Sequence, residues 1–378
     1  MGRGGDADDP RRTGPGIGRR ARECSPGWWD SGRPGRARAV TAAGGRPLRV
    51  LDALDYHTEG EPLRIVRAGV PDLPGPTMLE RTGRFAAQHD DLRRLVLFEP
   101  RGHAAMCAAF LVPPSDPGAD TGVVFVEPAG VVHMCGHGAM AVATMLVETA
   151  QVATREPDTE VTLDTAAGRV TARVGVRDGR VVGTTIRNVA SYSALLDAKV
   201  TIPGLGTVPF DLAYGGHFYA LVEARPLGFA LEPREAARLV EVGERIRAAI
   251  QAEFPLEHPE GEQSRGLLSI QFYGPATTPG ATLRNAVVVA PAGLDRSPCG
   301  TGTSARLANL WARRAIAVGE RFVHESIIGS RFEAWIAATT RVGPYDGVVP
   351  EIAGRAWLAG MNQLVLQPND PFPAGFLL

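Results

Sequence analysis

Cysteine, lysine and long hydrophobic runs are scarce in this chain of 378 residues. The four cysteines, Cys24, Cys107, Cys135 and Cys299, are too few for a disulfide framework and predict a reducing, cytoplasmic compartment. No apolar run approaches the ~20 residues that a membrane-spanning helix needs. Lys199 is the only lysine and lies in a strand-like stretch, so the Schiff-base chemistry of pyridoxal-phosphate enzymes is not expected.

Charge and motif content exclude further classes of protein. The chain carries 40 basic and 41 acidic residues, and 44% of it is hydrophobic, which indicates a soluble globular protein with no nucleic-acid or membrane partner. Neither a G-x-G-x-x-G dinucleotide motif nor a P-loop lysine motif is present. The length is sufficient for two domains and a large core.

Residues 1–46 differ from the rest of the chain. They contain ten arginines and five acidic residues among many glycines and prolines, with little apolar periodicity. Such a composition cannot bury enough apolar surface to order itself, so we predict a disordered tail. The paired arginines at 11–12 and 19–20 are not followed by an apolar segment, which argues against a secretion signal.

From residue 47 onward the sequence alternates short β-type runs with few helices. The predicted strands are Leu48–Leu54, Leu63–Ala68, Arg94–Phe98, Gly122–Val126, Glu160–Asp164, Val170–Val176, Arg180–Arg187 and a strand-like stretch from Pro350. Apolar spacing predicts an amphipathic helix over Glu232–Phe254 and buried helices over Gly138–Ala150 and Gly302–Ala317. This mixture predicts an α+β fold of two lobes, each with mostly antiparallel strands around a central helix, and a boundary near residue 190.

One motif occurs twice. The pattern C-G-x-G-x-x-A begins at Cys135 and again at Cys299, 164 residues later. Each copy follows an apolar run and a Pro-Ala-Gly turn, with the prolines at Pro128 and Pro291. A strand, a turn and a cysteine at a helix start, repeated, predict a duplicated fold with one site between the halves.

Each Cys-Gly-x-Gly segment suits the start of a helix. The first turn offers backbone N–H groups without helical partners and a partial positive charge, which together bind a carboxylate. The same environment is expected to lower the pKa of a cysteine thiol. Two such helix starts facing one cleft would present a sulfur to each side of an amino acid's α-carbon, so that one thiolate removes a proton while the other thiol returns one.

Other interpretations of these residues remain open. Cys107 lies in an apolar stretch and is predicted to be a small core residue. Cys135 and His137 could be zinc ligands, although their spacing is not that of a C-x-x-C ligand pair and the sequence has no second such pair. Asp295, four residues before the second thiol, could pair with a substrate ammonium or simply cap a turn. His137 could hydrogen-bond the carboxylate or the amine of a substrate.

With these residues the chain resembles the proline racemase superfamily. The resemblance covers the sequence from about residue 48 to the C-terminus and lies in six ordered motifs: Asp55–Pro62, Glu99–His103, Met134–Gly138, Tyr214–Ala220, Asp295–Thr303 and Ser326–Ser330. It implies a diaminopimelate-epimerase-like fold of two pseudo-symmetric lobes. On that basis lobe I covers 47–189 and regains residues from about 355–378, and lobe II covers 190–354.

The resemblance also implies function. It suggests a homodimeric racemase or epimerase that inverts the α-carbon of proline or 4-hydroxyproline, a small imino acid, without cofactor or metal. Cys135 and Cys299 would be the catalytic residues. The implied substrate-binding residues are Gly136, His137, Gly138, Asp295, Gly300 and Thr301.

Two alternatives have different chemistry. The superfamily also contains dehydratases of trans-3-hydroxy-L-proline, and Leu63–Val66 and Tyr214–Ala220 resemble that branch. Those enzymes typically have threonine at the position of Cys299, because elimination needs only one base at the α-carbon. A non-catalytic amino-acid binding protein on the same scaffold is the third hypothesis, and two intact thiols argue against it.

The sequence departs from the superfamily pattern at three positions. His217 stands where asparagine is frequent, Ala105 where aspartate often follows the Arg-Gly-His stretch, and Glu59 where glycine is usual. These departures concern the ring substituent of the substrate more than the proton transfer.

Overall fold

The structure is a computed structural model that describes residues 1, 40–41, 47–254, 256–261 and 266–377. Apart from Met1, Val40 and Thr41, the predicted tail at 1–46 lies outside these residues. The described residues from Val40 onward belong to one compact unit. The domain boundary near residue 190 therefore stays a prediction.

The first half of the fold is a sheet of mostly antiparallel strands. Its strands are β1 (Val40–Thr41), β2 (Pro47–Thr58), β3 (Glu61–Ala68), β4 (Cys107–Val112), β5 (Thr121–Glu127), β6 (Gly130–Val132), β7 (Asp158–Thr165), β8 (Gly168–Arg177) and β9 (Arg180–Arg187). Adjacent strands pair antiparallel except β3 with β4 and β5 with β7, which are parallel.

The second half repeats this plan. Its strands are β10 (Ser191–Ile202), β11 (Gly206–Tyr214), β12 (Phe218–Glu223), β13 (Leu267–Pro275), β14 (Leu283–Val289), β15 (Gly293–Asp295), β16 (Phe322–Glu325), β17 (Arg331–Val342) and β18 (Tyr345–Gly354). The parallel pairs are again the third with the fourth strand of the half, β12 with β13, and the pair of strands that flank the buried helix in the sequence, β14 with β16. The duplication inferred from the two cysteine motifs therefore extends to the strand pairing.

Strand β18 links the halves. Its C-terminal end pairs with β9, while residues near its start pair with β10. The last strand, β19 (Ala356–Leu366), pairs antiparallel with β2 along its length, so the C-terminal segment adds a strand to the first half.

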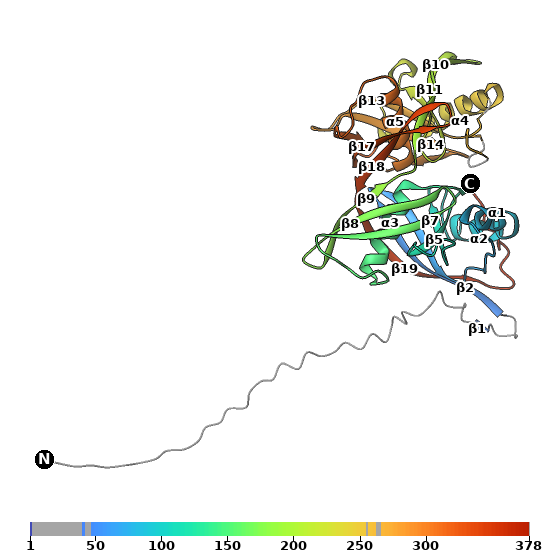
Figure 1. Ribbon diagram of the computed structural model, residues 1–378. Coiled ribbons are helices and arrows are strands. Elements are labelled where there is room, and N and C mark those ends of the chain that lie inside the picture. Colours follow the sequence, from blue (N-terminus) through green and yellow to red (C-terminus); the bar gives the residue numbers. More distant parts are fainter. Residues whose placement is uncertain (2–39, 42–46, 255, 262–265, 378) are drawn as a thin grey trace. The chain divides into compact units, whose positions relative to one another are not determined.

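A buried helix occupies each half (Figure 1). Helix α3 (Gly136–Glu148) packs against β7, β8 and β9, and α5 (Gly300–Ala312) packs against β10, β11 and β18. Nearly every residue of α3 is buried, because small or apolar residues, mostly Gly, Ala, Met and Val, lie on all sides of this helix. The predicted α+β fold, with strand-rich lobes around central helices, is confirmed.

Three amphipathic helices and two 3₁₀ turns complete the described part of the fold. Helix α1 (Met78–Gln88) contacts β5, α2 (Asp90–Leu97) contacts β4 and β5, and α4 (Ala236–Glu253) contacts β13 and β14; the turns are Arg225–Leu227 and Pro233–Glu235. No helix in the described part of the chain is long and apolar enough to cross a membrane.

The prediction of a strand at Arg94–Phe98 is wrong. These residues lie at the end of α2, where Leu92, Leu95 and Val96 are buried at helical spacing. Asp90 and Asp91 stand in its first turn, where the helix dipole favours acidic side chains. A short apolar run of this kind fits either a strand or a helix. Its β-type composition suggested a strand, whereas the spacing of its buried residues is helical.

The two buried helices begin two residues earlier than predicted, because each cysteine is itself the residue that precedes the first helical turn. Helix α5 also ends at Ala312 instead of Ala317. At their starts the helices touch each other. A Cβ atom added to Gly136 would lie 2.8 Å from the Cα of Gly300, and one added to Gly300 would lie 2.9 Å from the Cα of Gly136. Only glycine permits this approach.

Gly136→Ala is therefore expected to push the two helix starts apart and lower the free energy of unfolding by about 1–3 kcal/mol, the usual cost of overpacking. Gly83→Ala is the matched control, because nothing lies within 4 Å of a Cβ at that position in α1. The control should be neutral or stabilising by up to ~1 kcal/mol. Urea unfolding of both variants measures the difference; equal behaviour of the two would contradict the close contact.

Candidate active site

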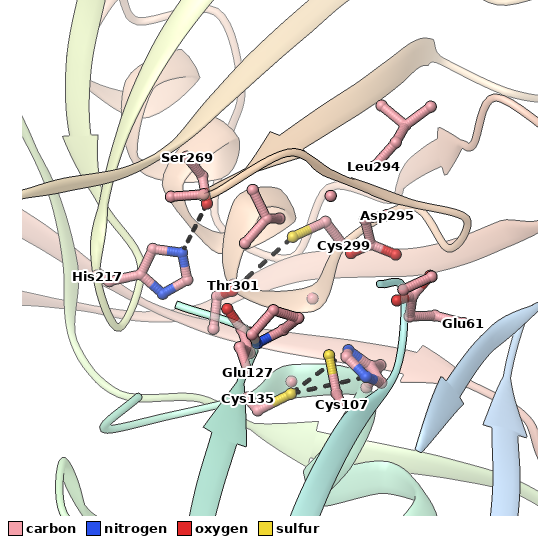
Figure 2. Close-up of a pocket in the computed structure, with 18 of the residues that line it drawn as sticks. Glu61, Cys107, Glu127, Cys135, His217, Ser269, Leu294, Asp295, Cys299 and Thr301 are labelled. Atoms are coloured by element: carbon pink, nitrogen blue, oxygen red, sulfur yellow. Dashed lines mark hydrogen bonds between the residues drawn. The ribbon is translucent and has the colours of Figure 1, made fainter. Parts of the chain in front are cut away.

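Cys135 and Cys299 occupy equivalent positions in the two halves. Each follows a short hairpin, β5–β6 or β14–β15, and each precedes the first turn of a buried helix. Their side chains are 4% and 5% exposed, and both line one pocket. Figure 2 shows Cys299 on one side of this pocket and Cys135 on the other.

The second glycine of each motif makes room for the sulfur. A Cβ added to Gly138 would lie 3.0 Å from Sγ of Cys135, and one added to Gly302 would lie 3.0 Å from Sγ of Cys299. The backbone N–H groups of Gly138 and Gly302 also donate hydrogen bonds to these sulfurs. The C-G-x-G pattern thus has two functions: the first glycine permits helix contact and the second seats the thiol on its helix start.

The two cysteines differ in backbone conformation. Cys135 is extended, whereas Cys299 has φ of +62°, a left-handed conformation that is unusual for a residue with a side chain. Such a conformation costs on the order of 1–3 kcal/mol and occurs mainly where the surroundings impose it. The hydroxyl of Ser297 accepts a hydrogen bond from the backbone N–H of Cys299 and helps to hold it.

Residues from both halves surround the thiols. The pocket is lined by Glu61, Ala104, Ala105, Cys107, Glu127, Pro128, Cys135, Gly136, His137, His217, Tyr219, Ser269, Val289, Ala290, Gly293, Leu294, Asp295, Cys299, Gly300 and Thr301. Backbone N–H groups of two helix starts, three thiols, three carboxyl groups and two imidazoles therefore face one space.

Polar side chains contact each sulfur. Sγ of Cys299 lies 3.3 Å from the hydroxyl of Tyr219, which lies 2.6 Å from the hydroxyl of Thr301. The loop before Tyr219 reaches this helix start because Gly215 lies directly against it: a Cβ there would be 2.1 Å from the carbonyl oxygen of Thr301.

Cys135 has a different neighbour. Its Sγ lies 3.4 Å from Nδ1 of His137, whose backbone carbonyl accepts a hydrogen bond from the hydroxyl of Thr58. Burial lowers the pKa of His137, which keeps the ring neutral near pH 7. The sequence suggests a hydrogen bond from this histidine to the substrate, and in the structure its ring also lies beside the thiol of Cys135.

Burial decides the ionisation of both thiols. It raises the pKa of Cys135 and of Cys299 well above the ordinary value, and nearby carboxyl groups add to this effect. The backbone N–H of Gly138 and that of Gly302 act in the opposite direction but are outweighed. The net shift of both thiol pKa values is therefore opposite to the one expected from the helix starts alone, because desolvation is the larger effect.

Asp295 lines the pocket, and one of its two carboxylate oxygens accepts hydrogen bonds from the protein. Its Oδ1 accepts hydrogen bonds from the backbone N–H and the hydroxyl of Ser297. Its Oδ2 has no hydrogen-bond partner among the described residues, which leaves it available to a cationic group in the pocket.

Two further carboxyl groups line the pocket. Glu61, on β3, accepts a hydrogen bond from the backbone N–H of Arg296 and so connects the two halves. Glu127, at the end of β5, is buried, and burial together with the charge of Asp295 raises its pKa to about 7. Burial and Asp295 also raise the pKa of Glu61.

The structure brings the predicted site residues together. All of them line the pocket except Gly138, which lies against Sγ of Cys135 instead. Sequence reasoning missed Glu61, Glu127, Tyr219 and Ser269. Of these, Glu61 and Tyr219 lie inside quoted motifs, which was a usable signal, whereas nothing in the local pattern distinguished Glu127 or Ser269.

Three other residues need comment. Cys107 is buried in the core cluster, as predicted, and it also lines the pocket. Of the departures from the superfamily pattern, His217 and Ala105 line the pocket but Glu59 does not. No group of three or more His, Cys, Asp or Glu side chains among the described residues could hold a metal ion.

Comparison with known proteins gives a consistent result. The sequence model of the proline racemase family matches residues 53–377. A 4-hydroxyproline 2-epimerase from Streptosporangium roseum is 46% identical over 336 residues, covering 88% of this chain and 100% of the relative. A proline racemase from Clostridioides difficile is 38% identical over 330 residues, covering 87% of this chain and 98% of the relative.

Solved structures agree. The crystal structure of a hydroxyproline epimerase from Agrobacterium vitis, with trans-4-hydroxy-L-proline bound, has a TM-score of 0.82 and 36% identity, covering 87% of this chain and 96% of that one. A PhzF-family protein from Bacillus anthracis shares only the fold, at 15% identity and a TM-score of 0.54, covering 84% of this chain and 99% of that one.

The raised thiol pKa values predict slow alkylation at neutral pH. The rate of iodoacetamide labelling at Cys135 and Cys299 should rise with pH and reach half its maximum at a higher pH than for an exposed cysteine, because only the thiolate reacts. Peptide mapping by mass spectrometry after timed labelling gives the rate for each site. Half-maximal labelling of either residue below pH 7 would show that the helix start, and not burial, controls its ionisation.

Proposed function

The chain belongs to the proline racemase family, and we propose that it inverts the α-carbon of proline or 4-hydroxyproline with Cys135 and Cys299 as the acid–base pair. The observation that carries this proposal is that both thiols, each at the start of a buried helix, line one pocket. The resulting enzyme is an amino-acid isomerase that needs no cofactor.

The substrate's carboxylate would bind where α3 and α5 meet. Gly136 and Gly300 are in contact, so the N–H groups of both first turns converge on a small region. Their partial positive charges stabilise a carboxylate, and they stabilise it more as it gains enolate character. The free oxygen of Asp295 would pair with the secondary ammonium of the ring.

Proton transfer then follows from the position of the sulfurs. One cysteine, as thiolate, removes the α-proton, and the electron pair of the C–H bond moves into the carboxylate. The other cysteine, as thiol, donates its proton to the opposite face of the planar carbon. The product has the inverted configuration, and the two cysteines have exchanged protonation states.

The surroundings support unequal resting states for the two thiols. Tyr219 can donate a hydrogen bond to Sγ of Cys299, which stabilises a thiolate there, whereas a neutral His137 contacts Cys135. Because burial raises both thiol pKa values, kcat/KM should rise with pH until one thiol ionises and fall when both have done so. The homodimer and the cytoplasmic location expected from the sequence stay predictions.

Incubation in heavy water tests the proposal. L-Proline and trans-4-hydroxy-L-proline, supplied separately, should yield products with deuterium at the α-carbon and the D configuration for at least one of them. Chiral chromatography with mass spectrometry measures both properties. Absence of exchange with either substrate would contradict the proposal.

Cys299→Ser separates inversion from elimination. Because serine is a far weaker acid and base, the variant should lose at least about 100-fold in the inversion rate, within the range of general acid–base contributions. Cys107→Ser is a matched control, since its sulfur lines the same pocket but has no assigned proton transfer. Formation of a pyrroline carboxylate from trans-3-hydroxy-L-proline by Cys299→Ser would support a dehydratase instead.

A further inference from the structure

One carboxyl group in the pocket has no role in the reaction as described. Glu127 is 8% exposed and lines the pocket, and its side chain has no hydrogen-bond donor among the residues that the structure describes. The other two carboxyl groups are engaged: Glu61 accepts the N–H of Arg296, and Asp295 accepts two hydrogen bonds from Ser297. Glu127 alone is without a donor.

The carboxyl group of Glu127 lines the pocket, and its oxygens are not among the fully buried unpaired polar atoms of the described residues. When a bound ligand buries such a group, the group needs a hydrogen-bond donor, because buried polar groups are nearly always paired. A group of this kind that faces a pocket can obtain its missing donor from a bound ligand. The carboxylate and the ammonium of the substrate already have partners at the two helix starts and at Asp295. A donor for Glu127 therefore has to come from a substituent on the substrate ring.

A second unpaired polar atom belongs to a side chain that lines the same pocket. Nδ1 of His217 is buried without a hydrogen-bond partner, while Nε2 lies 3.2 Å from the hydroxyl of Ser269. Burial lowers the pKa of His217 to about 3, so the ring is neutral and its Nδ1 can donate or accept according to its tautomer. The pocket therefore offers unused polar capacity from each half of the fold, on Glu127 and on His217.

From these contacts we propose that Glu127 is a specificity-determining residue that accepts a hydrogen bond from a hydroxyl group on the substrate ring. This inference rests on the proposed function and narrows its substrate class to hydroxylated prolines. Plain proline would offer no hydrogen-bond donor to the carboxyl group of Glu127, whereas a ring hydroxyl would supply one. His217, on the other half of the fold, adds a polar surface to the same pocket.

Charge strengthens the predicted contact at alkaline pH. A pKa of about 7 means that Glu127 is mostly ionised at pH 8, where an enzyme with raised thiol pKa values is also more active. A hydroxyl that donates to a carboxylate forms a charge-assisted hydrogen bond, which is roughly twice as strong as a neutral one. The preference for a hydroxylated substrate should therefore be largest above pH 7.

The test compares two substrates with two variants at pH 8. For Glu127→Ala, kcat/KM for trans-4-hydroxy-L-proline should fall about tenfold or more, mainly through KM, while kcat/KM for L-proline changes less than about threefold. Glu127→Gln keeps the size of the side chain. It should change the preference between the two substrates in the same direction, but by a smaller factor. If circular dichroism shows that Glu127→Ala does not fold, the Glu127→Gln variant tests the proposal by itself.

Glu59→Gln is the matched control. It removes one carboxylate that bonds the backbone N–H of Arg355 outside the pocket, and both substrates should be unaffected. An equal loss for both substrates in the Glu127 variants would overturn the proposal, because it would assign Glu127 to the substrate's ammonium or to the thiols. No change for either substrate would overturn it as well. Failure of the wild-type enzyme with both substrates would instead refute the proposed function.

Discussion

The contact between the starts of α3 and α5 is the constraint on which the site depends. Gly136 and Gly300 allow the two helices to meet at van der Waals distance, so that two sets of unpaired N–H groups point into one pocket. The same contact fixes the separation of Cys135 and Cys299, each one residue before its glycine. A larger residue at either glycine would move both the anion site and the sulfurs.

The two halves of the fold are alike in the positions of their helices and thiols, and they differ in the side chains that contact each thiol. The halves share strand pairing, helix position and the C-G-x-G motif, which places equivalent groups on opposite sides of the pocket. The immediate neighbours differ: Tyr219 contacts one thiol and His137 the other. A two-base reaction needs one protonated and one deprotonated sulfur at each turnover, and the different neighbours favour one of these two arrangements.

The sequence alone was sufficient for the architecture and for the paired cysteines, because the repeated motif is local and its glycines have a clear steric purpose. It was insufficient where three-dimensional surroundings decide. Arg94–Phe98 was assigned to the wrong element because a five-residue apolar run fits both periods. The direction of the thiol pKa shifts was wrong because burial is not visible in a motif. Glu127 was missed because no local pattern indicates that the end of β5 meets the pocket.

The most direct test of the account is a crystal structure of the enzyme with pyrrole-2-carboxylate, a planar analogue of the flattened transition state. The account predicts the ring between the two cysteines, with Sγ of Cys135 and Sγ of Cys299 on opposite faces, each about 3–3.5 Å from the carbon that bears the carboxylate. The carboxylate should contact N–H groups at the starts of both helices. Both sulfurs on one face of the ring, or one sulfur at about twice that distance, would contradict it.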